Sequence, residues 1–352
     1  MDDILSGADT LTEAYQLQQE VTGLLAKGGF GTHKWCANHS NILQDIPEDL
    51  RGNSFFVTDD MSKTTVKSLG LTWNPIEDWF SVSVPEYDDF NEITRRKLLS
   101  QLAKLFDPLG FFGPVITTAK LILREVGELQ IEWDDPVPLN ISSKWKSFRN
   151  ELMVLNEVRL PRWISWKNQL RLELHGFADA SDSAYGACLY VRAFFPDGSD
   201  QMRLICSKSR ILPKKRAKNK VITTPRAELL AAVLLARLVV KLLDASELDF
   251  GSRNLWSDSK IVLAWIKKPP HVLHTYVSNR VSEIQNSTLN CRWKYILSQE
   301  NPADLISRGK LPTELVNSRM WWTGPPTFNC SVVEKVEEVN FRMKVYPKCV
   351  IE

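Results

Sequence analysis

Residues 172–181 place an acidic side chain, Asp179, near the end of an apolar run that reads as a β-strand. Leu172 and Leu174 alternate with polar residues, which is typical of a strand with one buried face. Residues 184–193 form a second strand-like run that could return beside the first as a hairpin. A carboxylate at the end of a core strand is costly unless it is paired or binds a cation. A structural aspartate explains this position about as well as a functional one, so the meaning of Asp179 depends on acids elsewhere in the chain.

Length and composition are those of a globular chain. The 352 residues are 43% hydrophobic and 24% charged, which fits two or three domains. The net charge of +2 gives no basic field over the whole molecule, so any nucleic-acid binding has to come from local patches. The six cysteines include no Cys-x-x-Cys pair and are expected to be reduced thiols.

We expect no secretory signal and no membrane span. The N-terminus reads Met-Asp-Asp-Ile-Leu and lacks the basic and apolar regions of a signal peptide. The most apolar run, residues 229–243, is interrupted by Arg237 and Lys241 and is typical of a buried helix. These features predict an intracellular protein, cytoplasmic or nuclear, without a membrane partner.

The chain from about residue 165 onward has the pattern of an α/β domain. Strands are expected at 172–181, 184–193, 202–209, 254–257 and 290–297, and helices at 225–243, 260–267, 275–285 and from 302. Thr224 is expected to cap the first of these helices, with Pro225 at its first helical position. Three early strands followed by alternating helices and strands predict a mixed sheet with helices on its faces.

The earlier part of the chain is expected to be more helical. Helices are expected at 11–25, 94–106, 114–129 and 145–157, and a pair of strands at 66–73 and 79–84. Gly28 and Gly29 are expected to end the first helix.

Four acidic residues stand at the ends of elements in the α/β region: Asp179, Glu228, Asp258 and Asp304. The carboxyl ends of strands and a helix beside them can meet at one crevice of such a sheet. Converging carboxylates repel one another, and hard oxygen ligands suit Mg²⁺ or Mn²⁺. Two such ions form the arrangement that cleaves phosphodiesters. Taken singly, each acid also has a structural explanation, because Glu228 and Asp304 lie where a helix dipole favours negative charge.

The segments that carry these acids resemble a retroelement RNase H domain. The match runs in order through Gly176-Phe-Ala-Asp-Ala-Ser, Ala184-Tyr-Gly-Ala, Thr224-Pro-Arg-Ala-Glu-Leu, Trp256-Ser-Asp-Ser and Asn301-Pro-Ala-Asp-Leu-Ile-Ser-Arg-Gly. The resemblance implies an α/β fold with a mixed five-stranded sheet flanked by helices. It implies that the four acids are the catalytic residues and hold two Mg²⁺ or Mn²⁺ ions. The implied reaction is endonucleolytic hydrolysis of RNA in an RNA–DNA hybrid.

The amino-acid sequence resembles even more closely the BEL/Pao class of long-terminal-repeat retrotransposon polyproteins. The resemblance is carried by Phe106-Asp-Pro-Leu-Gly-Phe-Phe-Gly-Pro-Val, Ser207-Lys-Ser-Arg, Val277-Ser-Asn-Arg-Val-Ser-Glu-Ile and Met320-Trp-Trp-Thr-Gly-Pro. Met1-Asp2-Asp3 resembles the end of the reverse-transcriptase Tyr-Met-Asp-Asp motif, so Asp2 and Asp3 would be residual palm carboxylates. The fingers and the rest of the palm would be missing, so no polymerase activity is expected.

The resemblance implies four regions. Residues 1–90 would be a partial reverse-transcriptase palm, 91–164 thumb and connection, and 165–312 the RNase H-like domain. Residues 313–352 would be a tail towards an integrase region that the chain lacks. Other segments of the polyprotein would be partners, and no protease motif (Asp-Thr-Gly or Asp-Ser-Gly) is present.

Two features complicate this interpretation. Many RNases H have a histidine on the loop before the last acid, but residues 296–303 contain none, and Gln299 or Glu300 is a partial substitute at best. One basic run could grip hybrid phosphates, act as a nuclear-import signal, or be a solvated loop. Its members are Lys214, Lys215, Arg216, Lys218 and Lys220. The rival to an active RNase H is a catalytically inactive retroelement remnant that binds nucleic acid or protein.

Overall fold

The computed structural model describes residues 3–8, 10–52, 65–68, 71–84, 92–129, 131–163, 169–213, 222–246, 248–328 and 348–350. The chain forms two compact units. The first comprises Met1–Ser83, Val158–Trp163 and Glu334–Glu352, and the second comprises Val84–Glu157 and Ile164–Val333.

The first unit contains two small sheets and one long helix. One sheet has the order β1-β12-β2 and the other the order β3-β4-β5-β6. The strands are β1 (Asp3–Leu5), β2 (His33–Cys36), β3 (Val66–Ser68), β4 (Leu71–Asn74), β5 (Trp79–Ser81), β6 (Leu160–Pro161) and β12 (Lys348–Val350). The run 66–73, expected as one strand, is divided into β3 and β4, which pair antiparallel with each other. The expected pairing with residues 79–84 is confirmed between β4 and β5.

The helix of the first unit, α1 (Leu11–Lys27), has clear signals at both ends. Thr10 caps it through a reciprocal capping box with Glu13. It ends at Gly28, as expected, and the next residue, Gly29, has a φ of +79°, a conformation that favours glycine.

The second unit begins with three helices: α2 (Arg95–Ala103), α3 (Gly113–Glu128) and α4 (Leu139–Glu151). Thr94 caps α2 as its sequence suggests, but the helix ends before residue 106. The prediction that the third helix starts at Trp145 is wrong, because α4 begins directly after Pro138 and is followed by a 3₁₀ segment at Leu152–Glu157. Trp145 lies mid-helix and fully buried, and its indole N–H donates to Gln101 Oε1 at 2.7 Å.

A mixed five-stranded sheet follows, with the order β11-β10-β7-β8-β9. Its strands are β7 (Arg171–Ala180), β8 (Ala184–Phe194), β9 (Asp200–Ile211), β10 (Ser252–Ser257) and β11 (Arg292–Tyr295). The expected hairpin is confirmed, since β7, β8 and β9 pair antiparallel in sequence order. β10 pairs parallel with both β7 and β11, which makes the sheet mixed as the pattern of elements predicted.

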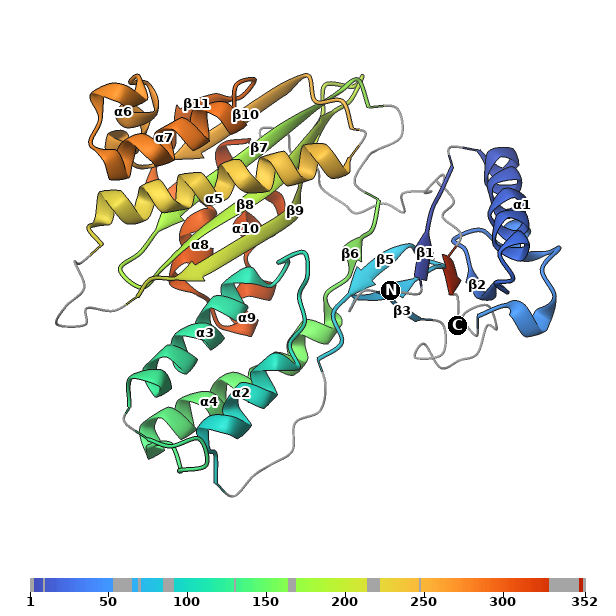
Figure 1. The fold of residues 1–352 in the computed structure, drawn as a ribbon, viewed down its shortest axis with the longest axis horizontal. Coiled ribbons are helices and arrows are strands. Elements are labelled where there is room, and N and C mark those ends of the chain that lie inside the picture. Colours follow the sequence, from blue (N-terminus) through green and yellow to red (C-terminus); the bar gives the residue numbers. More distant parts are fainter. Residues whose placement is uncertain are drawn as a thin grey trace. The chain divides into compact units, whose positions relative to one another are not determined.

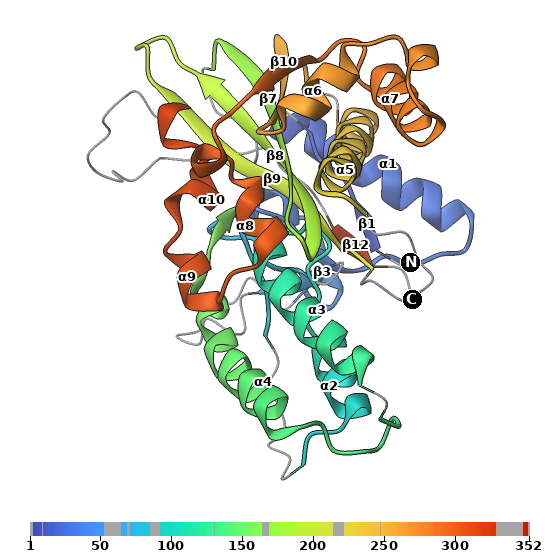
Figure 2. The same ribbon diagram turned by 90° about the vertical axis from the view of Figure 1, so that its left-hand side faces the viewer.

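Helices cover both faces of this sheet. Figure 1 shows α5 (Thr224–Ala245) lying across the strands, and α6 (Lys260–Ile266) and α7 (Thr275–Ser287) pack beside it. α8 (Ala303–Arg308) and α10 (Arg319–Thr323) lie on the opposite face, where α3 also contacts β9 (Figure 2). A short helix, α9 (Pro312–Val316), joins α8 to α10. Among the described residues, no helix is long and apolar enough to cross a membrane.

Strand alternation decides which residues of β7 face each helical layer. Leu172, Leu174 and Ala178 join the apolar core beneath α5. Asp179, one residue further along, therefore points to the opposite face, where Ser307 of α8 meets it.

The start of α5 differs by one residue from the expected position. Thr223, rather than Thr224, is the N-cap, and its side chain makes no capping bond. The reason is that the helical hydrogen bonding starts from the Thr223 carbonyl, which accepts the Ala227 N–H at 3.0 Å. Thr224 and Pro225 therefore occupy the first two helical positions.

The Asp-Pro-Leu-Gly loop before α3 is fixed against the edge of the sheet. The carboxylate of Asp107 accepts the backbone N–H groups of Phe111 and Phe112 at 2.9 and 2.8 Å. Burial raises the pKa of Asp107 to about 6, against these hydrogen bonds, which lower it. The Ser207 N–H of β9 donates to the Leu109 carbonyl at 2.9 Å. Because β9 is an edge strand of the five-stranded sheet, the loop continues the backbone hydrogen bonding past this edge.

Trp321 belongs to the core. It is fully buried, and its indole N–H donates to the Phe111 carbonyl at 2.7 Å. Its own carbonyl accepts the hydroxyl of Tyr190 at 2.7 Å. Cys36, Cys188, Cys206 and Cys291 form no disulfide bond within the described part of the chain.

Candidate active site

The fold brings the two strand-end aspartates to the same edge of the sheet. In the parallel pair β7–β10, Ala178 lies opposite Ser257. Asp179 and Asp258 are the next residues of the two strands, so they leave neighbouring strands at the same end. The sequence predicted that acids at strand ends could converge on one crevice, and the parallel pairing of β7 with β10 is what brings these two together.

Asp179 is the most buried of the four acids. It is 7% exposed, and one of its carboxylate oxygens accepts a hydrogen bond from the hydroxyl of Ser307. Burial raises the pKa of Asp179 to about 6, and the negative charges of Asp258 and Asp304 raise it further, against the hydrogen bond from Ser307. The structure therefore places Asp179 within electrostatic reach of two of its three expected partners.

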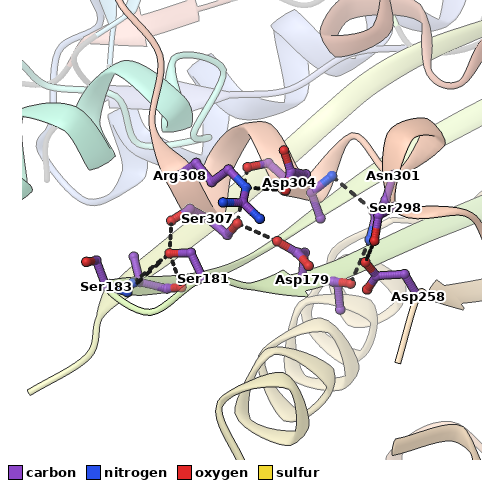
Figure 3. A network of polar contacts seen from close by, with 12 residues as sticks. Asp179, Ser181, Ser183, Asp258, Ser298, Asn301, Asp304, Ser307 and Arg308 are labelled. Carbon is purple, nitrogen blue, oxygen red and sulfur yellow. Dashed lines mark hydrogen bonds and ion pairs between the residues drawn. The ribbon is translucent and has the colours of Figure 1, made fainter. Parts of the chain in front are cut away.

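Asp304 lies at the start of α8, and it pairs with a cation of the same helix. The Nε of Arg308, four residues later, donates to Asp304 Oδ1 at 2.5 Å. Figure 3 shows the Arg308 side chain running along α8 towards Asp304, with Ser307 between this pair and Asp179. The hydrogen bond and the charge of Asp304 raise the pKa of Arg308, with smaller contributions from Asp179 and Asp182.

Asp258 directly follows β10, and its two carboxylate oxygens lie in different environments. Oδ2 accepts a hydrogen bond from the hydroxyl of Ser298, as Figure 3 shows. Oδ1 is buried and has no hydrogen-bond partner among the described residues. A buried carboxylate oxygen without a partner is costly in the absence of a cation or an ordered water.

Glu228 lies near the start of α5, and it is held by a serine from another element. The hydroxyl of Ser259, the N-cap of α6, donates to Glu228 Oε2. Burial raises the pKa of Glu228, and the charge of Asp258 raises it further, against the hydrogen bond from Ser259. Asp258 therefore interacts electrostatically with both Glu228 and Asp179.

The four acids form one electrostatic group, but they do not form a closed ligand cage. Within the described part of the chain, no three carboxylate, imidazole or thiol groups converge closely enough to hold a metal ion. Each acid is instead hydrogen-bonded to a serine hydroxyl or to a guanidinium. The donor set fits a hard divalent cation, since all four groups are carboxylates and Asp258 Oδ1 lacks a partner. Asp258 Oδ1 is open to a cation as it stands, whereas Asp304 Oδ1 is held by Arg308.

The hydrogen-bond partners of the acids were not predicted from the sequence; they are Ser259, Ser298, Ser307 and Arg308. Only the last two carried a usable signal, because residues three and four positions after Asp304 lie on the same face of a helix. The other serines come from elements that no local pattern connects with the acids, since Ser298 lies 40 residues from Asp258 in the sequence.

Two groups of predicted residues lie wholly or partly outside the described part of the chain. Asp2 lies outside the described residues, and Asp3 is described only as part of the backbone of β1. The basic residues Lys214, Lys215, Arg216, Lys218 and Lys220 also lie outside the described residues.

Residues 94–259 match a family model described as the Pao retrotransposon-like RNaseH-like domain. The matched segment begins at the cap of α2 and includes Asp179, Glu228 and Asp258, but it ends before Asp304. No curated protein matches the chain.

Several solved structures resemble parts of the chain. The N-terminal RNase H domain of a Mycobacterium tuberculosis protein, solved as a fusion with maltose-binding protein, is 16% identical with a TM-score of 0.28, over 41% of this chain and 96% of that one. LC11-RNase H1 in complex with an RNA/DNA hybrid is 13% identical with a TM-score of 0.28, over 41% and 99% of the two chains.

A foamy viral protease-reverse transcriptase, solved with an RNA/DNA hybrid, is 12% identical with a TM-score of 0.42. That match covers 83% of this chain but only 34% of the viral one, so the chain spans about a third of that protein. The family match therefore confirms the resemblance at the level of a retroelement RNase H-like domain over residues 94–259.

Proposed function

We propose that this chain is a metal-dependent ribonuclease that hydrolyses the RNA strand of RNA–DNA hybrids. The main support is the parallel pairing of β7 with β10, which brings Asp179 and Asp258 out at one edge of the sheet. Asp304 and Glu228 interact electrostatically with these two acids from α8 and α5. The family match to an RNaseH-like domain supports the same reaction class.

The four carboxylates would hold two Mg²⁺ or Mn²⁺ ions. When bound, such ions supply the positive charge that activates water and stabilises the leaving 3′-oxygen of a phosphodiester. The chain's own residues position the acids: Ser307 orients Asp179, Ser298 orients Asp258 and Ser259 orients Glu228. Hybrid recognition would depend on A-like shape, 2′-hydroxyls and phosphates more than on bases. The basic run at 214–220, between β9 and α5, would contribute phosphate contacts.

We further propose that the chain derives from a BEL/Pao-type polyprotein and retains the last part of a reverse-transcriptase palm at residues 1–90. This origin is supported by the motif Met1-Asp2-Asp3 and by the segment Phe106-Asp-Pro-Leu-Gly, which lies within the matched region. Other segments of the polyprotein would be its partners.

The alternative is a catalytically inactive remnant that only binds nucleic acid or protein. One structural observation favours it: each of the four acids already has an internal hydrogen-bond donor, and Arg308 neutralises one of them. The absence of a histidine from residues 296–303 points the same way.

Parallel binding and cleavage assays with the full chain separate these two functions. The probe is an RNA–DNA hybrid labelled on the RNA strand, tested with wild type and with Asp179→Asn in the presence of Mn²⁺. An active nuclease cuts the hybrid, and the variant loses cleavage by at least about a hundredfold while it still binds. Equal binding by both proteins without any cleavage would support the remnant instead.

A further inference from the structure

Arg308 places a positive charge against the carboxylate cluster through the helix that carries Asp304. The two residues are four apart on α8, and the Arg308 Nε lies 2.5 Å from Asp304 Oδ1. The Arg308 side chain is 65% exposed, so it can move into solvent without breaking any core packing. Figure 3 shows it above Ser307, on the side of α8 that faces Asp179.

The charges around Arg308 belong to the cluster and not to one acid alone. Asp304 acts on it most strongly, and Asp179 and Asp182 also favour its charged form. The ionised form of Asp179 in turn is destabilised by the negative charges of Asp258 and Asp304. A guanidinium at this position therefore offsets part of the repulsion that Asp258 and Asp304 exert on the ionised form of Asp179.

A guanidinium and a divalent ion compete for the same ligand. A carboxylate can accept a hydrogen bond and bind a cation at the same time, but two positive charges at one carboxylate repel each other, so the Arg308 guanidinium weakens the binding of a cation at Asp304. A group that binds only one of two states shifts the equilibrium towards that state. Arg308 favours the metal-free arrangement by this rule.

We infer that Arg308 is a resident counter-ion of the carboxylate cluster, which neutralises Asp304 in the metal-free protein and weakens the binding of a divalent cation there. This inference rests on the proposed metal-dependent function. It adds a specific consequence: the chain binds its metal ions more weakly than its four carboxylates alone would allow.

The chain contains a matched ion pair outside the site, which provides a control. Arg237 of α5 pairs with Glu283 of α7 through two contacts of 2.5 and 3.1 Å. Its side-chain exposure, 52% for the arginine and 36% for the glutamate, is close to the 65% and 31% of the pair formed by Arg308 and Asp304. Removing Arg237 therefore removes a similar surface ion pair without changing the charge at the cluster.

The test measures Mn²⁺ binding to the full chain by calorimetry and by the electron paramagnetic resonance of free Mn²⁺. The proteins are wild type, Arg308→Gln, Arg308→Lys and Arg237→Gln, each checked for folding in chelator. Arg308→Gln is expected to bind Mn²⁺ about three- to tenfold more tightly than wild type, because a competing charge pair of ordinary surface strength is gone. Arg308→Lys keeps the charge and should remain near wild type, and Arg237→Gln should match wild type.

The possible failures are distinguishable. Equal Mn²⁺ affinity in wild type and Arg308→Gln, or weaker binding by the variant, would overturn the role of Arg308 and leave the metal-dependent function standing. Tighter binding by Arg237→Gln to the same extent would also overturn it, because the effect would then reflect net charge alone. Absence of Mn²⁺ binding by every protein would overturn both the inference and the proposed function.

Discussion

Replacement of Asp179 by asparagine should stabilise the metal-free protein at neutral pH. Asp179 is 7% exposed, and its pKa is raised from 3.8 to about 6, first by burial and then by Asp258 and Asp304. Each pKa unit corresponds to about 1.4 kcal/mol, so the ionised side chain costs the folded state up to about 3 kcal/mol. Asparagine carries no charge and keeps an oxygen that can accept the hydroxyl of Ser307.

The sign of the pH dependence follows from the raised pKa. Between about pH 4 and pH 6 the folded state holds a proton on Asp179 that the unfolded state has lost, so the free energy of unfolding falls as the pH rises through this window. Asp179→Asn has no ionisable group at this position, so its free energy of unfolding does not fall for this reason. We expect Asp179→Asn to be more stable than wild type by about 1–3 kcal/mol at about pH 7.5, and to have little advantage below about pH 4.

The assay is urea unfolding in chelator at these two pH values, followed by far-ultraviolet circular dichroism. Asp107→Asn is the control, because burial raises the pKa of Asp107 to about 6 as well. Both carboxylate oxygens of Asp107 accept backbone N–H groups, and an amide can replace only one of them, so this variant should gain nothing. A wild type that is as stable as Asp179→Asn at about pH 7.5, or an equal gain at both pH values, would refute the reasoning.

Two further predictions concern the packing and the hydrogen bonds at the site. Gly186→Ala should destabilise the protein by about 1–3 kcal/mol and weaken cleavage, because the Cβ of the new alanine would lie 2.5 Å from Ile306 of α8. Gly127→Ala is the control, since there is open space around this position of α3. It should be neutral or stabilising in the same thermal unfolding and cleavage assays. Ser307→Ala should raise the pKa of Asp179 further, because the hydroxyl of Ser307 stabilises the ionised carboxylate. The metal-free variant should lose about 1 kcal/mol of stability at neutral pH and none at acid pH, measured by urea unfolding at both. An equal loss of stability at the two pH values would contradict this prediction.

The order of elements in the second unit was predictable because each one carries its own periodic signal. β7 alternates in its first half, at Leu172 and Leu174, and α5 combines an apolar stripe with a proline near its start. Boundaries were less accurate, as at the starts of α5 and α4, because the first turn of a helix depends on which carbonyl accepts the first hydrogen bond.

The convergence of Asp179 and Asp258 was predicted only in outline, because the sequence does not show that β7 and β10 are parallel neighbours. The hydrogen bonds of the acids were not predicted at all. Ser298 and Ser259 reach Asp258 and Glu228 only through tertiary packing of loops and helix ends. No spacing rule in the sequence connects such residues.

The segment around Asp107 was recognised only by its resemblance to a family, and the structure gives it a physical role. Gly110 has a φ of +76°, and a side chain there would collide with the Ser207 carbonyl of β9. The contact joins residues 97 positions apart in the sequence. A local reading of the chain therefore could not explain why this loop contains glycine.

The most direct test of the nuclease assignment is cleavage of an RNA–DNA hybrid that carries a different label on each strand. We predict that the folded full chain, in Mg²⁺ or Mn²⁺, cuts the RNA strand internally and leaves the DNA strand intact. Chelator should abolish cutting, and Asp258→Asn should reduce it by at least about a hundredfold. No cleavage by the folded wild type in either metal, or undiminished cleavage by Asp258→Asn, would contradict the assignment.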